Sequence, residues 1–387
     1  MTRGRSHGLA AAAGALIAAG CGGGSGADPD AASEVDAAPI DPLCPVEEGE
    51  GVFFEPDGPP CEKLSSYRFF EDLPGQVPSE GVVPFDVNSA LFSDYTSKQR
   101  FVWLPEGESM TYREDEAFDF PVGAVLIKTF YYPDDAREPE GPRRLLETRL
   151  LVHRPDGWDG LIYQWDDEQS EATHNRFGDV VPVSWIDRHG EERELDYLVP
   201  DVNDCAACHV RDREMVPIAP QARHLNRDFD YGEGPNNQLA HLAAIGYLEG
   251  APAEPDDAPR APVFDDPDTG GVTERARAWL DINCGHCHNP EGPGRTSGLD
   301  LQASQTEPFR FGVCKPPVAA GAGSGGLQYG IVPGEPDESI LVFRIESTEP
   351  NIQMPEIMRQ VPHVEGNALV REWIADMDGS CGGEDDE

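Results

Sequence analysis

The sequence has little positive charge. It contains 29 Lys and Arg residues against 72 Asp and Glu residues, which gives a formal net charge of -43 at pH 7. This composition argues against nucleic acid as a partner, because the phosphates would be repelled. An acidic surface keeps a protein soluble and steers a basic partner protein toward it. A solvated surface suited to a salty habitat explains the same charge, since net charge alone does not identify a partner.

Long apolar runs are also absent, apart from residues 9–19, which are too few to span a bilayer. Arg3 and Arg5 precede this run, as in an export signal. Its end, Ile17-Ala-Ala-Gly-Cys21, resembles a bacterial lipobox, although Ala18 stands where leucine is usual. We expect a periplasmic or outer-membrane-anchored lipoprotein of a Gram-negative bacterium, attached to the membrane only through a lipid on Cys21. An ordinary secretory signal with an unmodified Cys21 is the alternative.

Two short motifs carry recognisable chemistry. Cys205-Ala-Ala-Cys-His209 and Cys284-Gly-His-Cys-His288 each contain two cysteines two residues apart, followed at once by a histidine. This pattern is the attachment signature of a c-type haem, in which the cysteines form thioether bonds and the histidine is the proximal iron ligand. The sequence therefore predicts two covalently bound haem c groups. The residues that hold them would be Cys205, Cys208, His209, Cys284, Cys287 and His288.

Two other interpretations of these cysteines are open. Both pairs could converge on one structural zinc ion, which explains the cysteines but leaves both histidines without a role. A thioredoxin-like redox pair is less consistent with the sequence, because neither motif lies in a strand-to-helix βαβ context.

The other cysteines fit an oxidising compartment. The chain has nine cysteines, of which four are assigned to haem and one to lipid. The remaining four, an even number, can form disulfides. Three pairings of these are possible. Cys44 with Cys61 and Cys314 with Cys381 is the simplest, because each pair closes within one segment.

The region from about residue 67 to 200 has the pattern of an antiparallel β domain. Short runs rich in β-branched and aromatic residues alternate with Pro, Gly and Asp clusters. Residues 145–153 and 161–165, joined by Pro155-Asp-Gly-Trp158, are typical of a hairpin. Hairpins without intervening helices favour a sandwich. We find no metal-ligand spacing, nucleophile elbow or phosphate loop in this region, and predict no active site there.

Candidate sixth iron ligands follow both motifs. Met215, His224 and His241 lie after the first motif, and an open or water-occupied position is equally compatible with the sequence. After the second motif, Met354 precedes Pro355, which keeps the chain from coiling into a helix and lets a soft sulfur project from an extended loop. Met354 is therefore the predicted ligand opposite His288, ahead of Met358 and Met377, which fit core positions better.

Helical patterns flank the second motif. A helix from about Thr273, as N-cap, would carry Trp279 on its apolar face, and residues 364–377 recur at helical spacing around Trp373. Residues 238–248 predict a further short helix.

Several phrases of the sequence resemble a known family. These are Asn88-Ser-Ala-Leu-Phe-Ser-Asp-Tyr95, residues 120–130, residues 312–321, and residues 331–341 followed by Met354-Pro355. The last of these looks like a class I-type bacterial cytochrome c domain. Residues 67–375 together resemble a family of poorly characterised bacterial diheme c-type cytochromes. The resemblance implies haem c binding and electron transfer in the cell envelope, and supplies no known substrate.

These observations predict an α+β multidomain fold. An N-terminal antiparallel β-rich, sandwich-like domain would be followed by mostly α-helical, cytochrome c-like haem regions. Residues 22–60 contain few large apolar side chains, cannot fold alone and would form a tether. The expected segments are 1–20 (signal peptide), 21–60 (tether), 61–200 (β-rich domain), 201–260 (first haem segment) and 261–383 (C-terminal cytochrome c domain).

The expected function is electron transfer between redox partner proteins that would dock through basic surfaces. The alternative is an enzyme, a diheme peroxidase-like oxidoreductase in which the first haem has an open face. No obvious distal ligand can be recognised for the first haem, which favours the enzyme. No acid/base pair can be recognised near the motif, which favours the carrier.

Overall fold

The computed structural model describes residue 44, residues 50–318 and residues 320–382. The export signal, the lipobox with Cys21 and most of the tether lie outside these residues. Asp41–Glu387 forms one compact unit. Within the part of the chain that the structure describes, no helix is both long and apolar enough to cross a membrane.

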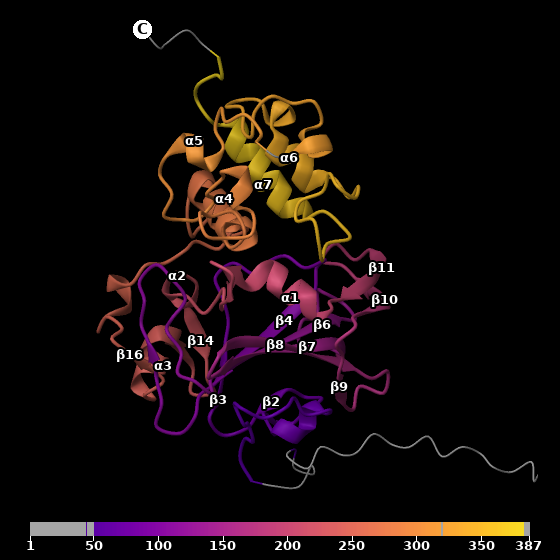
Figure 1. The fold of residues 1–387 in the computed structure, drawn as a ribbon, viewed down its shortest axis with the longest axis vertical. Helices are drawn as coiled ribbons and strands as arrows, with labels where there is room; N and C mark the ends of the chain where they lie inside the picture. The colour runs from indigo at the N-terminus through magenta and orange to yellow at the C-terminus, as the bar shows by residue number, and fades with distance from the viewer. Residues whose placement is uncertain (1–43, 45–49, 319, 383–387) are drawn as a thin grey trace, which may run out of the picture. The chain divides into compact units, whose positions relative to one another are not determined.

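An antiparallel six-stranded sheet is the centre of the fold (Figure 1). β7 and β8 form the expected hairpin, in which Arg154 pairs with Gly157 across Pro155 and Asp156. The strand order is β3-β4-β6-β7-β8-β9. Their bounds are β3 Val82–Phe85, β4 Ser97–Trp103, β6 Val125–Pro133, β7 Arg143–Arg154, β8 Gly157–Trp165 and β9 Ala172–His174.

Short two-stranded ribbons surround the sheet. All of them are antiparallel except β5-β16, which is parallel. The ribbons are β1 Phe70–Asp72 with β2 Val77–Pro78, β5 Met110–Thr111 with β16 Leu248–Glu249, β10 Asp179–Ile186 with β11 Glu192–Val199, β12 Val210–Arg211 with β13 Glu214–Met215, and β14 Asp228–Asp230 with β15 Pro235–Asn237.

The helices are short and follow the last strand of the sheet in sequence. The longest, α7, agrees with the helix expected around Trp373, whereas α4 begins after an N-cap at Gly271 rather than Thr273. The α-helices are α1 Val202–His209, α2 Ala222–Leu225, α3 Gln238–Ala244, α4 Val272–Leu280, α5 Pro308–Phe311, α6 Ile340–Glu346 and α7 Val364–Ala375.

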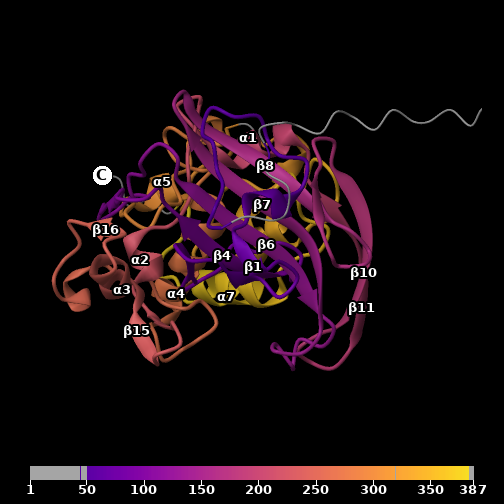
Figure 2. The ribbon, with the colours of Figure 1, turned by 90° about the horizontal axis from the view of Figure 1, so that it is seen from below.

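The two faces of the sheet are covered differently. One face packs against the segment around Tyr67 and Phe69 in a continuous apolar core. The other face carries two separate apolar clusters, one with α2, α3 and β16, and one with the β10-β11 ribbon. Figure 2 shows α2 and α3 at one side of the sheet and β10-β11 at the other. The middle of this second face is therefore not occupied by either cluster.

A further core lies in the C-terminal part, where α4, α6 and α7 pack together. Trp279 and Trp373 are buried in this part of the chain. The indole of Trp279 also donates to His363, whose ring stacks on Phe92 from the region before β4. Asn283 accepts a hydrogen bond from the backbone N–H of Phe92. The C-terminal part is thus joined to the rest of the unit through buried polar and aromatic contacts.

The expected fold class is wrong. The structure has 26% strand and 22% helix in several antiparallel sheets, so the regions after residue 200 do not form the mostly helical, cytochrome c-like domains that the motifs suggested. The sheet is also not one half of a sandwich, because helices and the β10-β11 ribbon cover its second face. Short helices beside a motif determine only the local structure. Between these helices the chain forms two-stranded ribbons and loops.

The expected disulfide pairing is confirmed. Cys44 bonds to Cys61 and Cys314 bonds to Cys381, with Cα–Cα distances of 5.6 Å and 5.2 Å. Both distances lie in the ordinary range for disulfides. Among the described cysteines, the unpaired ones are the four that belong to the two motifs.

Candidate functional site

The first motif lies in α1, directly after β11. Asp201 caps this helix: its side chain accepts from the N–H groups of Asn203 and Asp204, and Asp204 bonds back to the Asp201 N–H. This capping box satisfies backbone donors that would otherwise be free at the helix start. Helical spacing then places Cys205, Cys208 and His209 on one side of α1, at positions i, i+3 and i+4.

The second motif has the same local arrangement. It follows α4 through a π-helical turn, Asp281–Gly285. The N–H groups of Cys287 and His288 both donate to the carbonyl oxygen of Cys284, at 3.1 Å and 2.8 Å. Cys284, Cys287 and His288 therefore also project from one side of a helical turn. Two segments far apart in the sequence thus each direct two cysteines and a histidine to one side.

Both predicted proximal histidines are held by one ring nitrogen. Nδ1 of His209 lies 3.0 Å from the carbonyl oxygen of Val216, and Nδ1 of His288 lies 3.0 Å from the hydroxyl of Ser297. Desolvation lowers the pKa of each imidazole to about 4, so both rings are neutral at pH 7. A metal-bound histidine commonly uses its second nitrogen in this way, which fixes ring orientation and leaves Nε2 as the ligand.

The fold brings the two motifs into contact. The thiols of Cys208 and Cys287 are hydrogen-bonded to each other, which lowers the pKa of the first and raises that of the second. The Cys287 sulfur also lies 3.9 Å from the carbonyl oxygen of Ala207. His286, inside the second motif, is a further neighbour of Cys208. The motifs were separate features of the sequence, and the structure makes them one site.

Contacts on the loops after the motifs reinforce this arrangement. Arg211, two residues after His209, pairs with Glu291, three residues after His288. The N–H of Asp212 donates to the carbonyl oxygen of the same glutamate at 3.1 Å. In Figure 1, α1 lies between the six-stranded sheet and the C-terminal helices.

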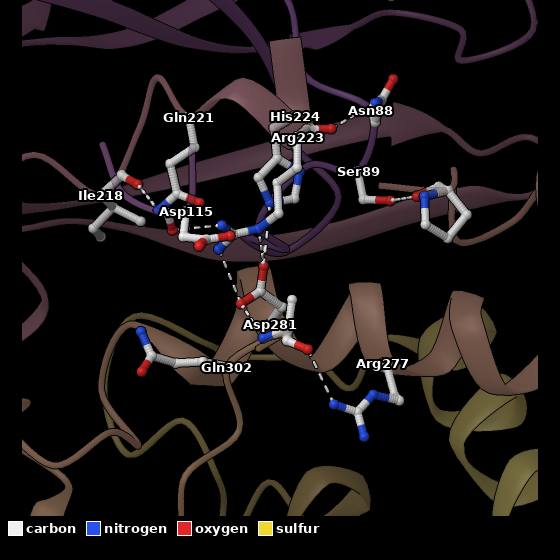
Figure 3. A network of polar contacts seen from close by, with 12 residues as sticks. Asn88, Ser89, Asp115, Ile218, Gln221, Arg223, His224, Arg277, Asp281 and Gln302 are labelled. Carbon is white, nitrogen blue, oxygen red and sulfur yellow. Dashed lines mark hydrogen bonds and ion pairs between the residues drawn. The ribbon is translucent and has the colours of Figure 1, made fainter. Parts of the chain in front are cut away.

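A buried carboxylate holds the turn that leads into the second motif. Asp281, at the start of the π-helical turn, accepts from Arg223 at 2.8 Å and 3.2 Å and from the N–H of Ala303 at 2.9 Å. Nε2 of His224 lies 3.4 Å from the same carboxylate. Burial raises the pKa of Asp281, but the His224 and Arg223 contacts outweigh it and hold that pKa at about 2. Figure 3 shows Arg223 and His224 directed toward Asp281.

The sheet lies directly under the first motif. A Cβ atom at Gly160 of β8 would lie 3.2 Å from Cβ and 3.3 Å from Sγ of Cys205, so the absence of a side chain there allows α1 to approach. Lys128 of β6 is close enough to Cys208 to interact electrostatically, and Arg149 of β7 is similarly close to Cys205.

The three residues that the sequence offers as sixth ligands after the first motif differ in position. Met215, on β13, has its sulfur 3.9 Å from the Cβ position of Gly160 and so shares this part of the sheet with Cys205. His224 is fully buried against Asp281. His241 stacks on Tyr231 with ring centroids 3.5 Å apart. The structure brings Met215 to the neighbourhood of the first motif and engages both histidines elsewhere.

Met354 lies on a loop next to the second motif. Its N–H donates to the carbonyl oxygen of Arg344 at 3.0 Å, and the Arg344 side chain pairs with Glu356 at 3.3 Å. Both charged groups influence the pKa of His288. Arg344 and Glu356, which flank Met354 in space, therefore lie near the His288 imidazole.

The arrangement of donors fits haem better than a bound zinc ion. In the described ranges, no group of three or more His, Cys, Asp or Glu side chains converges as metal ligands. Structural zinc needs four protein ligands at one point. A haem iron takes four nitrogens from the porphyrin and needs only an axial histidine, with at most one further axial ligand from the protein. Each motif offers one neutral histidine for the iron and two unpaired cysteines, at i and i+3, for the thioether bonds.

Sequence reasoning missed several residues of the site. Val216 and Ser297, which hold the histidines, carry no sequence signal. Lys128 does carry one, because it is the one charged residue of β6. Its cross-strand neighbour Arg149 is found only from the strand pairing. Comparisons with known protein families, with characterised proteins and with solved structures gave no match, so the interpretation of the site rests on its own residues.

Proposed function

We propose that the protein is a diheme c-type cytochrome that transfers electrons between redox partners in the bacterial cell envelope. The observation that carries the proposal is the contact between two Cys-x-x-Cys-His motifs. Each has unpaired cysteines and a neutral histidine held through Nδ1. When bound, the haem irons supply one-electron redox chemistry.

The residues of the chain do the positioning. The Val216 carbonyl and the Ser297 hydroxyl orient His209 and His288, so that Nε2 of each ring is available to iron. The contacts of Glu291 with Arg211 and with the N–H of Asp212 keep the two attachment points adjacent. Asp281 and Arg223 hold the second attachment point against the first segment. A short separation between two redox centres is what an electron carrier with two of them requires.

Met354 would complete the second site. A thioether ligand raises the reduction potential of a His-ligated haem, so the haem at Cys284 and Cys287 should be the higher-potential centre. The first haem would have the lower potential if no protein ligand lies opposite His209, whereas a Met215 ligand would bring the two potentials together. We further propose export to the periplasm or outer membrane through the signal in residues 1–20, with a lipid on Cys21. The redox partners would have basic docking surfaces that complement the -43 charge.

The proposal is tested by counting haem in the protein purified from a host that matures c-type cytochromes. The pyridine haemochrome of the wild type should give two haems per chain. The variants Cys205→Ser/Cys208→Ser and Cys284→Ser/Cys287→Ser should each retain one. A wild-type protein with no covalent haem, and with one zinc ion per chain by elemental analysis, would sink the proposal in favour of the zinc site.

A second function has one observation in its favour. His224 and His241 are both engaged elsewhere, against Asp281 and Tyr231, so neither is positioned to close the first haem. An open face there would allow a peroxidase-like reaction. The EPR spectrum of the oxidised diheme protein distinguishes the two functions: low-spin signals unchanged by peroxide support the carrier, whereas a high-spin fraction that peroxide converts supports the enzyme.

A further inference from the structure

The ribbon of β10 and β11 has one face against the first motif and one face toward solvent. Successive side chains of a strand point to opposite faces. The side chains that are buried against the sheet stand at odd-numbered positions and include Val183, Trp185, Tyr197 and Val199. Cys205 packs against this cluster. A haem attached at Cys205 would therefore lie behind the inner face of the ribbon, and the even-numbered side chains form its outer face.

The outer face is apolar at the end that adjoins α1. Val180 is 53% exposed, and its cross-strand partner is Leu198. Phe177, in the loop before β10, is 91% exposed, the highest value for a large apolar side chain among the described residues. This loop contacts the start of α1, where the N–H of Val202 donates to the carbonyl oxygen of Arg176. We call Phe177, Val180 and Leu198 the Phe177 patch. Exposed apolar groups gathered in this way are typical of a surface that contacts another protein.

Carboxylates continue the outer face away from the Phe177 patch. Glu192, Glu194 and Asp196 stand at alternate positions of β11 and are exposed. Their cross-strand partners on β10 are uncharged, namely Ile186, Ser184 and Pro182. Arg193 points to the other face and is paired with acidic residues of the turn between the two strands. Among the described residues, none of the three carboxylates has an ion-pair partner.

A groove of about 480 Å³ lies beside the patch, between β10 and the edge of the six-stranded sheet. Val180 lines it together with Asp166, Asp167 and Asp179. Arg144, also in its lining, is engaged by Asp167 and by a backbone carbonyl of β10. The groove therefore adds negative charge on the second side of the Phe177 patch.

We propose that the outer face of the β10-β11 ribbon, from the Phe177 patch to Glu192, is the docking surface for a redox partner protein with a basic contact surface. This inference rests on the proposed function. Charge decides the occupant, because unpaired carboxylates attract Lys and Arg side chains. They repel an acidic protein, including a second copy of this chain with its net charge of -43. The Phe177 patch supplies the apolar centre of the contact.

The position of the surface assigns it to the first haem. The inner face of the same ribbon packs on Cys205. A partner on the outer face would be separated from that attachment point by little more than the ribbon, and packed sheets are about 10 Å apart. One electron then passes from the ferrous iron of the first haem to the oxidised partner, which is reduced by one electron. The second haem, attached in the C-terminal part, would supply the first.

Electron transfer to a basic blue-copper protein tests the inference. The reduced diheme protein is mixed with the oxidised copper protein in a stopped-flow instrument, and the loss of the copper absorption is followed. Glu194→Lys/Asp196→Lys should lower the second-order rate constant about tenfold at low ionic strength, because the surface no longer attracts the basic probe. Phe177→Ser should lower it about fivefold, because an apolar contact at the centre is lost.

Matched controls lie on the opposite side of the sheet. Glu106→Lys/Glu108→Lys, in an exposed part of the loop between β4 and β5, makes the same change in net charge. Ile245→Ser, at the end of α3, replaces an apolar side chain that is 44% exposed. Both controls should keep rate constants close to that of the wild type. Equal slowing by the two charge-reversal variants would mean that only net charge acts, and would overturn the inference.

Haem is counted in every variant before its rate is measured. If Glu194→Lys/Asp196→Lys and Phe177→Ser bind two haems and react as fast as the wild type, the ribbon is not the docking surface. A wild-type protein without covalent haem would instead overturn the proposed function, so the two failures are distinguishable.

Discussion

Asp281 is the side chain on which the geometry of the site depends most. It is buried in the turn that leads into Cys284 and receives hydrogen bonds from Arg223 of α2 and from the backbone of Ala303. A buried ion pair contributes little net stability, but removing one partner leaves the other charge buried and unpaired. We therefore regard Asp281 as the residue that joins α2 to the second motif.

The substitution Asp281→Asn should lower the free energy of unfolding at pH 7 by about 3 kcal/mol, because it leaves the guanidinium of Arg223 without its ion-pair partner. Chemical denaturation of the holoprotein measures this loss. Asp119→Asn, in an exposed pair with Arg113, is the control and should have no measurable effect. Equal midpoints for wild type and Asp281→Asn would show that the pair does not hold the two segments together.

The same residue gives a pH dependence with a defined sign. Its pKa is about 2 in the folded protein and about 3.9 in an unfolded chain. The contribution of Asp281 is thus complete above about pH 4 and is lost as the pH falls through 2. Acidification over this range should destabilise the wild type more than Asp281→Asn, and an identical acid response would contradict the assignment.

Among the secondary-structure elements, those specified by local pattern were predictable. Alternating apolar residues around Pro155 and Asp156 gave the β7-β8 hairpin, and the spacing around Trp373 gave α7. The frame around the motifs was not predictable in this way. A helix next to a Cys-x-x-Cys-His sequence suggested helical haem domains, but the ends of α1 and α4 are set by Asp201 and Gly271 and by contacts distant in sequence.

The approach of α1 to β8 depends on one glycine. Gly160→Val would place branched carbon atoms against Cys205, whose Sγ is 3.3 Å from the Cβ position. We expect α1 to be displaced and haem attachment at the first motif to fall, so that the haem count per chain drops from two toward one. Gly160→Ala should have a smaller effect, because only one atom is added.

Haem staining of separated proteolytic fragments, followed by mass spectrometry of the two motif peptides, measures this change. The peptide with Cys284 and Cys287 is the internal control and should remain fully modified. If Gly160→Val leaves the peptide with Cys205 and Cys208 fully modified, the close approach of α1 to β8 is not needed for attachment.

At the scale of the whole molecule, the site is made by parts that are far apart in sequence. The two motifs, Lys128 and Arg149, and the Asp281 pair come from the sheet, from α1 and α2, and from the turn after α4. The motifs were predictable because each is a short local pattern. Both disulfides were predictable from the number and spacing of the remaining cysteines. It did not reveal that Cys208 meets Cys287, or that Lys128 lies beneath Cys208, because both depend on how the sheet pairs and how the later segments pack on it.

The adjacency of the two attachment sites is the central claim, and EPR of the fully oxidised protein tests it most directly. Two ferric haems held next to each other should show mutual magnetic interaction. The spectrum should then differ from the sum of the spectra of Cys205→Ser/Cys208→Ser and Cys284→Ser/Cys287→Ser, each with one haem. A wild-type spectrum equal to that sum, with two haems present, would contradict the account.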